Sequence, residues 1–125
     1  MSRVTASLRA RVTREGGIFM ENLKIARNVV TKIPNAETFV RECHDSLHKV
    51  MDGAPYDGSV SLSAEFDGQF FKTTIKLVSS SLRFSIVRAA RSPFVALEGV
   101  IKDALAKIDI WSALKNKTLG LHKED

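Results

Sequence analysis

Two histidines four residues apart are the first side chains in this sequence that could do chemistry. His44 and His48 would project from the same side of a helix, as two zinc ligands do. Cys43 adjoins them but falls in the apolar stripe of that helix, and the third histidine, His122, lies near the C-terminal end. No second ligand group has metal spacing, and no glutamate stands between the histidines as a zinc hydrolase requires. We therefore predict no metal ion and no cofactor, and a small metal-dependent enzyme using His44 and His48 is kept only as an alternative.

Signatures of other enzymes are missing from the sequence. It contains no glycine-rich phosphate loop, no nucleophile elbow and no pair of carboxylates placed by opposing strand ends. A hairpin turn explains Asp67, and Glu98, Asp103 and Asp109 follow the solvated side of a helix. The sequence therefore predicts a protein that is not an enzyme and that has no small-molecule substrate.

The basic residues carry a stronger functional signal. Lys72, Lys76 and Arg83 alternate out of phase with the apolar residues of their strands, so they would share the sheet face opposite the core. The same face would hold Lys24, with Glu65 as the exception among the acids. Its hydroxyl side chains are those of Ser61, Ser63, Thr74 and Ser85. Such a face suits phosphate contacts without base recognition, because cations and hydroxyls position a nucleic-acid backbone.

A second interpretation of the basic face remains open. Lysines on a solvated sheet face also prevent edge pairing and promote solubility. Phe70 is the only candidate for an aromatic platform there, so the face lacks the paired platforms of a single-strand RNA reader. Arg88 and Arg91 flank the junction into the last helix and extend the basic region.

The first two predicted elements are a strand and a helix. Residues 23–30 are predicted as a strand that ends before the turn at Pro34. Between residues 36 and 51 the apolar side chains recur on one helical face. Asn35 can cap the first turn of this helix, and Gly53 can end it in a left-handed conformation.

Three short segments with a period of two follow this helix. They span residues 59–66, 71–78 and 82–87, and each has one face suited to a core and one suited to water. Asp67-Gly68 between the first two is a strong signal for a tight hairpin turn.

The last predicted element is a helix that opens at Ser92-Pro93 and fades between Leu114 and Gly120. The chain order is thus strand, helix, three strands, helix. We predict a single α+β domain, a β-α-β-β-β-α sandwich with a four-stranded sheet and two helices packed on one face.

Length, composition and charge set the broad class. The 125 residues suffice for one domain, and a hydrophobic content of 44% excludes a disordered chain. No run approaches the roughly 18 apolar residues of a membrane helix, so no membrane partner is expected. A single cysteine, Cys43, excludes an internal disulfide and suits a reducing compartment, so we expect a cytoplasmic protein. The net charge of +5 indicates a polyanionic partner.

The ends of the chain are predicted to lie outside the domain. Residues 1–19 are arginine-rich and are expected to form a disordered leader. Three alternatives stay open for them: an organelle transit peptide, an electrostatic arm for nucleic acid, or an extension upstream of a start at Met20. The domain is expected to span residues 20–117, followed by a short tail at residues 118–125.

Three segments resemble one family. Residues 23–30, with the sequence LKIARNVV, are similar to its first strand, and residues 35–51 resemble its first helix, including the pair Phe39-Val40. Residues 85–108 are similar to its last strand and the helix that follows, which opens with an aromatic residue, small residues and a Leu–acid pair, here FVALE. With the order of elements, these segments resemble the hibernation-promoting factors and short ribosome-associated inhibitors of bacteria, over about residues 20–117.

The resemblance implies a function in ribosome hibernation, as part of the stress response of stationary-phase cells. The domain would bind the small ribosomal subunit in the channel of messenger and transfer RNA and block translation. The residues carried over as contacts to ribosomal RNA are Lys24, Arg27, Lys72, Lys76, Arg83, Arg88, Arg91 and Lys102.

The chain also departs from the family pattern. Residues 88–91 are Arg-Ala-Ala-Arg where many relatives are acidic, and the first helix nets acidic rather than lysine-rich. Without the C-terminal dimerisation domain of the long members, this chain would be a short form.

Two further functions remain as alternatives. One is a generic structured-RNA binder related in shape to double-stranded RNA-binding domains, which lack the first strand; a paired strand within residues 23–30 would count against it. The other is a protein–protein adaptor, for which an exposed apolar patch would be the discriminating observation.

Overall fold

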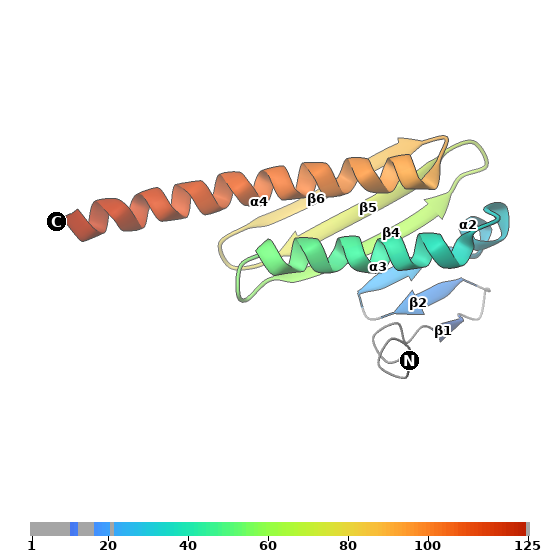
Figure 1. Cartoon of the computed structure of the whole chain (residues 1–125), viewed down its shortest axis with the longest axis horizontal. Coiled ribbons are helices and arrows are strands. Elements are labelled where there is room, and N and C mark those ends of the chain that lie inside the picture. The colour runs from blue at the N-terminus through green and yellow to red at the C-terminus, as the bar shows by residue number, and fades with distance from the viewer. Residues whose placement is uncertain (1–10, 13–16, 21, 125) are drawn as a thin grey trace.

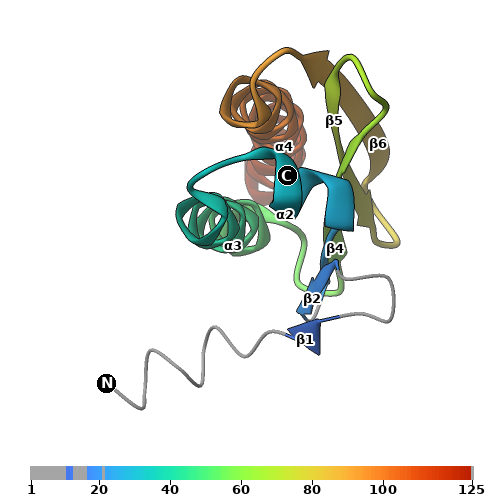
Figure 2. The ribbon, with the colours of Figure 1, turned by 90° about the vertical axis from the view of Figure 1, so that its right-hand side faces the viewer.

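The computed structural model of this protein describes residues 11–12, 17–20 and 22–124. Along the chain its elements are β1 (Arg11–Val12), β2 (Ile18–Met20), β3 (Leu23–Ile25), α2 (Arg27–Lys32), α3 (Ala36–Gly53), β4 (Ser59–Phe66), β5 (Phe71–Val78), β6 (Arg83–Ala90) and α4 (Pro93–Glu124). The two long helices run side by side along one face of a mixed sheet (Figures 1 and 2). The predicted α+β single domain, a sheet with two helices packed on one face, is confirmed.

The sheet has the order β1-β2-β3-β4-β5-β6. β3 and β4 are parallel, because the chain crosses over through α2 and α3 between them, and every other neighbouring pair is antiparallel. The four predicted strands are β3 to β6. β1 and β2 extend the sheet within the segment expected to be a disordered leader, so that expectation is wrong for these strands. Residues 1–10 and 13–16 lie outside the described residues.

The predicted first strand is shorter than expected and gives way to a helix. It ends at Ile25, Ala26 N–H donates the last bond to Ala64 O at 2.9 Å, and the chain then turns into α2. The residues packed inward there are Ala26, Val29, Val30 and Ile33. Their spacing of three, four and seven residues is helical rather than alternating, so the strand prediction for residues 26–30 is wrong. Asn28 fixes α2 against the sheet by donating from Nδ2 to Phe66 O at 2.6 Å.

The core lies between the sheet and the two long helices. On α3 the predicted stripe is buried, with Phe39, Cys43, Leu47 and Val50 each at most 2% exposed. α4 contributes the buried residues Leu97, Val100, Ile101, Ala104 and Ile108. Phe39 meets Phe94 edge to face, with ring centroids 5.3 Å apart, which locks the two helices together above the sheet.

The predicted helix ends are only partly confirmed. Ser92 caps α4 as expected, because its Oγ accepts a bond from Phe94 N–H at 3.2 Å. Asn35 forms no side-chain cap on α3, and Gly53 is the last residue of that helix instead of a left-handed residue beyond it. The chain leaves α3 through Ala54 in an extended conformation, which places Pro55 where no helix could continue.

The last helix runs further than predicted, to Glu124, and its end projects beyond the sheet (Figure 1). The expected end rested on Gly120, but one interior glycine costs a helix only about 1 kcal/mol relative to alanine. Within the described part of the chain, no helix is both long and apolar enough to cross a membrane.

Candidate nucleic-acid interface

The strand register defines the sheet face that the helices leave uncovered, which we call the open face (Figure 2). On β4 and β5 the residues of one parity are buried under α3 and α4, so those of the other parity point to the open face. Four rows of side chains cross it: Lys24, Ser63, Thr74 and Val87; Ser61, Lys76 and Ser85; Glu65, Lys72 and Ala89; and Ser59, Val78 and Arg83. The structure thus brings together the cations and hydroxyls that the alternation predicted.

The charge on the open face is largely uncompensated. Lys24, Lys76 and Arg83 are exposed and Lys72 is half-buried. Glu65 is the one acid of the four rows and lies opposite Lys72 in the register of β4 and β5. Among the described residues, no carboxylate oxygen lies within 4.0 Å of the ammonium groups of these three lysines. Lys24 and Lys76 are therefore available to a bound anion, whereas the charge of Lys72 also lowers the pKa of nearby Asp67.

The turn between β5 and β6 positions Arg83. Ser79 Oγ accepts bonds from Ser81 N–H at 3.2 Å and from Leu82 N–H at 2.8 Å, which closes the turn. Arg83 donates from Nε to Ser79 O at 3.3 Å, so one side of the guanidinium is held by the turn. The two terminal nitrogens form no ion pair with a residue that the structure describes, and they can donate to a phosphate.

Arg91 extends the open face at its far end. The register of β5 and β6 closes with Phe71 opposite Ala90, so Phe70 and Arg91 are the next residues on the two chains. They lie two residues beyond Lys72 and Ala89 and therefore share the open face. The Arg91 guanidinium carbon lies over the Phe70 ring, 5.9 Å from its centroid. Five of the eight basic residues predicted to bind RNA thus share one surface.

Arg88 points the other way. It pairs with buried Thr73 in the register of β5 and β6, which is the helix side of the sheet. Its Nε and Nη2 both lie 2.8 Å from Asp103 Oδ2 on α4. The hydrogen bond and the charge of Arg88 lower the pKa of Asp103, and Asp103 in turn raises the pKa of Arg88. Arg88 therefore ties β6 to α4 and is not among the free cations of the open face.

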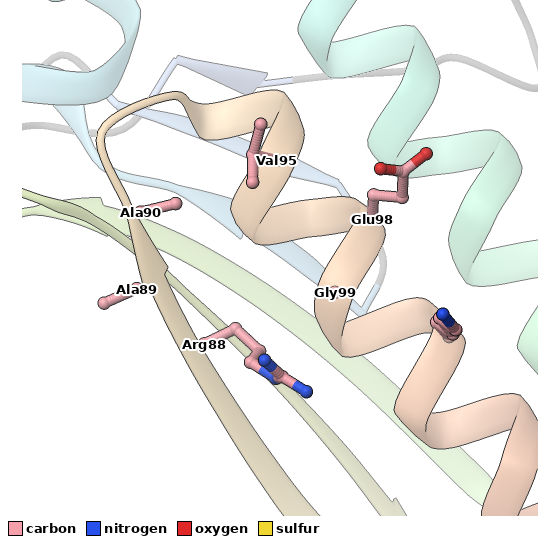
Figure 3. Close-up of a pocket in the computed structure, with 7 residues that line it drawn as sticks. Arg88, Ala89, Ala90, Val95, Glu98 and Gly99 are labelled. Atoms are coloured by element: carbon pink, nitrogen blue, oxygen red, sulfur yellow. The ribbon is translucent and has the colours of Figure 1, made fainter.

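A shallow pocket of about 520 Å³ lies beside this ion pair (Figure 3). Residues 88–90 line it from β6, and Val95, Glu98, Gly99 and Lys102 line it from α4. A Cβ at position 99 would stand 3.3 Å from Arg88 Cγ, so Gly99 allows the Arg88 stem to lie close to the helix. Lys102 is exposed here, on a different side of the molecule from the open face. Its lining holds one acid, Glu98, with the two bases Arg88 and Lys102, and Arg88 is already bound to Asp103, so the pocket is no extension of the basic face.

The remaining predicted residue, Arg27, is exposed on α2 rather than on a strand. Sequence reasoning missed a second cation on this helix, Lys32, whose Nζ lies 5.2 Å from the centroid of the Phe66 ring. The helical spacing of the apolar residues from 26 to 33 was the signal that would have grouped Arg27 and Lys32 on one short helix.

The two histidines come together but gain no further ligand. The rings of His44 and His48 have centroids 4.5 Å apart, and His44 Nδ1 lies 3.6 Å from an oxygen of Asp45. Cys43 is fully buried in the core, where burial raises the pKa of its thiol well above the usual range. A thiolate ligand is thereby disfavoured. No cluster of three or more His, Cys, Asp or Glu side chains suited to a metal ion occurs in the described part of the chain.

Comparison of the chain with protein-family models, with curated proteins and with solved structures gave no match.

Proposed function

We propose that this chain is a non-catalytic, RNA-binding stress factor of the cytoplasm that binds the small ribosomal subunit and inhibits translation. The single observation that carries this proposal is the open face. Lys24, Lys72, Lys76, Arg83 and Arg91 lie there among serine and threonine hydroxyls, with Glu65 opposite Lys72 and Asp67 at the end of the hairpin. Such a surface fits the phosphate backbone of a folded RNA. Occupation of the messenger and transfer RNA channel is the part of the proposal that the family resemblance supplies.

The first strand favours this proposal over the generic alternative. Double-stranded RNA-binding domains lack a strand before their first helix, whereas β3 pairs in parallel with β4 from Leu23 to Ile25. Because the helices cover one side of the sheet (Figure 2), the open face is the broad, polar surface that is accessible to RNA.

Ribosome pelleting tests the proposal. The full chain should co-sediment with ribosomes at low salt, and the bound fraction should fall steeply as salt rises because bound phosphates release counterions. Replacing Lys72, Lys76 and Arg83 by Glu should weaken binding by about 100-fold or more, since each lost charged contact is worth about 1 kcal/mol. The thermal unfolding transition should stay nearly unchanged, because none of the three side chains is buried.

A matched variant controls for net charge. Arg41 and Lys49 on α3 and Lys107 on α4 are all exposed, and replacing these three by Glu changes the net charge equally. This variant should pellet with ribosomes like the unmodified chain. Equal loss in both variants, or no binding of the unmodified chain to ribosomes at low salt, would contradict the proposal. Binding to folded RNA hairpins but not to ribosomes would favour the generic RNA binder instead.

A further inference from the structure

Phe70 and Arg91 form an aromatic corner at one end of the open face. The contact between ring and guanidinium is not needed for phosphate binding alone. Phe70, the residue before β5, is half-buried, and the guanidinium carbon of the exposed Arg91 lies 5.9 Å from the centroid of its ring. Lys72 is two residues from Phe70 on the same face, about 7 Å away along the strand. A phosphate held at Lys72 therefore has a flat apolar ring and a planar cation beside it.

The backbone that carries Phe70 is fixed before any ligand arrives. The Asp67 carboxylate accepts bonds from Gln69 N–H at 2.9 Å and Phe70 N–H at 2.8 Å. Asp67 N–H donates back to Phe70 O at 3.1 Å, and Gly68 supplies the left-handed conformation of the turn with φ of 99°. These bonds also lower the pKa of Asp67, so its carboxylate stays charged and bonded at neutral pH. The backbone of Phe70 is therefore held in place without a ligand, which reduces the backbone entropy that binding would otherwise lose.

We propose that Phe70 and Arg91 form a stacking site for one unpaired nucleobase, so that the open face takes an RNA helix that borders a bulge or loop. The inference rests on the proposed function and names the kind of RNA that the face prefers. An unstacked base can lie against the ring and guanidinium planes, as aromatic and arginine side chains do with single-stranded nucleotides. The N–H groups of the Arg91 guanidinium can also donate to the neighbouring phosphate.

The alternative is that the Phe70–Arg91 contact only stabilises the end of the two hairpins. A cation over an aromatic ring at an exposed site contributes little by itself. The two explanations differ in one measurable quantity, the preference for an RNA with an unpaired base over a fully paired RNA.

Binding of two RNA duplexes measures this preference. One is fully paired, and the other carries a single bulged 2-aminopurine, whose fluorescence falls when the base stacks. The unmodified chain should bind the bulged duplex about tenfold more tightly, in line with stacking of one base on an aromatic ring. Its 2-aminopurine fluorescence should fall on binding.

Variants of the corner then separate stacking from folding. Phe70→Leu should abolish both the preference and the fluorescence change while leaving affinity for the paired duplex unchanged, and Phe70→Trp should retain both. Arg91→Lys keeps the positive charge but removes the planar guanidinium. It should therefore reduce the preference for the bulged duplex without changing the affinity for the paired duplex. Tyr56→Leu alters a fully exposed aromatic outside the sheet and should change nothing. Thermal unfolding of each variant confirms that it is folded.

Failure of this inference is distinct from failure of the proposed function. Equal binding of both duplexes by the unmodified chain, or a preference that persists in Phe70→Leu, would overturn the stacking site and leave ribosome binding untouched. Absence of binding to both duplexes together with absence of ribosome pelleting would overturn both proposals.

Discussion

Thr73 is a buried polar residue, and the free-energy cost of burying its hydroxyl can be measured directly. It lies fully buried on the helix side of β5, between Ala64 of β4 and Arg88 of β6. No described group lies within hydrogen-bond distance of its Oγ1. A buried hydroxyl without a partner loses its bonds to water and gains none in return, which costs about 1–3 kcal/mol.

Thr73→Val should therefore stabilise the protein. Valine keeps the β-branched shape and strand preference of threonine while removing the hydroxyl. We expect the free energy of unfolding to rise by about 1 kcal/mol, measured by urea denaturation at constant m-value. Thr74→Val, on the neighbouring half-exposed position of the open face, is the control and should change stability much less. A lower free energy of unfolding in Thr73→Val would show that its hydroxyl has a partner in solution.

At the scale of elements, the Arg88–Asp103 pair joins the edge strand β6 to α4. Asp103 has a lowered pKa in the folded protein, so the pair contributes stability above the unfolded value of 3.8 and loses it as the pH falls through the folded value. Asp103→Asn should thus lower the thermal transition at neutral pH. The difference in transition temperature between this variant and the unmodified chain should disappear as the pH falls below 3.8.

Thermal unfolding of the two proteins over a pH series measures this convergence. Asp109→Asn removes an exposed carboxylate of the same helix that forms no ion pair within the described part of the chain, so it should leave the pH dependence nearly unchanged. A difference between Asp103→Asn and the unmodified chain that is constant across the pH series would contradict an ionic role for Asp103.

The sequence predicted those elements whose apolar period was long and uninterrupted. The α3 stripe and the alternation of β4 and β5 are unambiguous over many residues, and each was confirmed. Residues 23–33 were misjudged because only Leu23 and Ile25 alternate, and the helical set that begins at Ala26 overlaps the end of the strand. β2 has three residues, which is too few for any period to be recognised.

The same periodicity explains how much of the candidate site was predictable. Lys72, Lys76 and Arg83 follow directly from strand parity. Arg88 has the parity of Phe84 and Ile86, so its inward direction was available in the sequence, but its bond to Asp103 depends on how α4 crosses β6. The contact of Phe70 with Arg91 joins two strand ends and required the register of β5 and β6.

At the scale of the whole molecule, the acidic helix α3 lies on the other side of the sheet from the open face (Figure 2). α3 carries four acids against two basic residues, all of them exposed, whereas the open face with its extension at Phe70 and Arg91 has five cations against Glu65 and Asp67. A polyanion is therefore attracted to the sheet and repelled from the α3 side, which orients the protein before contact. The net charge of +5 does not reveal this bias, because it sums the acids of α3 with cations that lie on the other face.

The salt dependence of RNA binding measures how many of these cations contact phosphates. If each of the five open-face cations neutralises one phosphate, the logarithm of the binding constant should fall against the logarithm of salt concentration with a slope of about −4. Lys76→Ala should make this slope shallower by about one unit. Lys76 is exposed, lies at the centre of its row and forms no ion pair with a described carboxylate. Lys49→Ala on α3 should leave the slope as it is. Fluorescence anisotropy of a labelled RNA hairpin over a salt series gives both values, and a slope that responds to Lys49 rather than Lys76 would place the RNA on the helices.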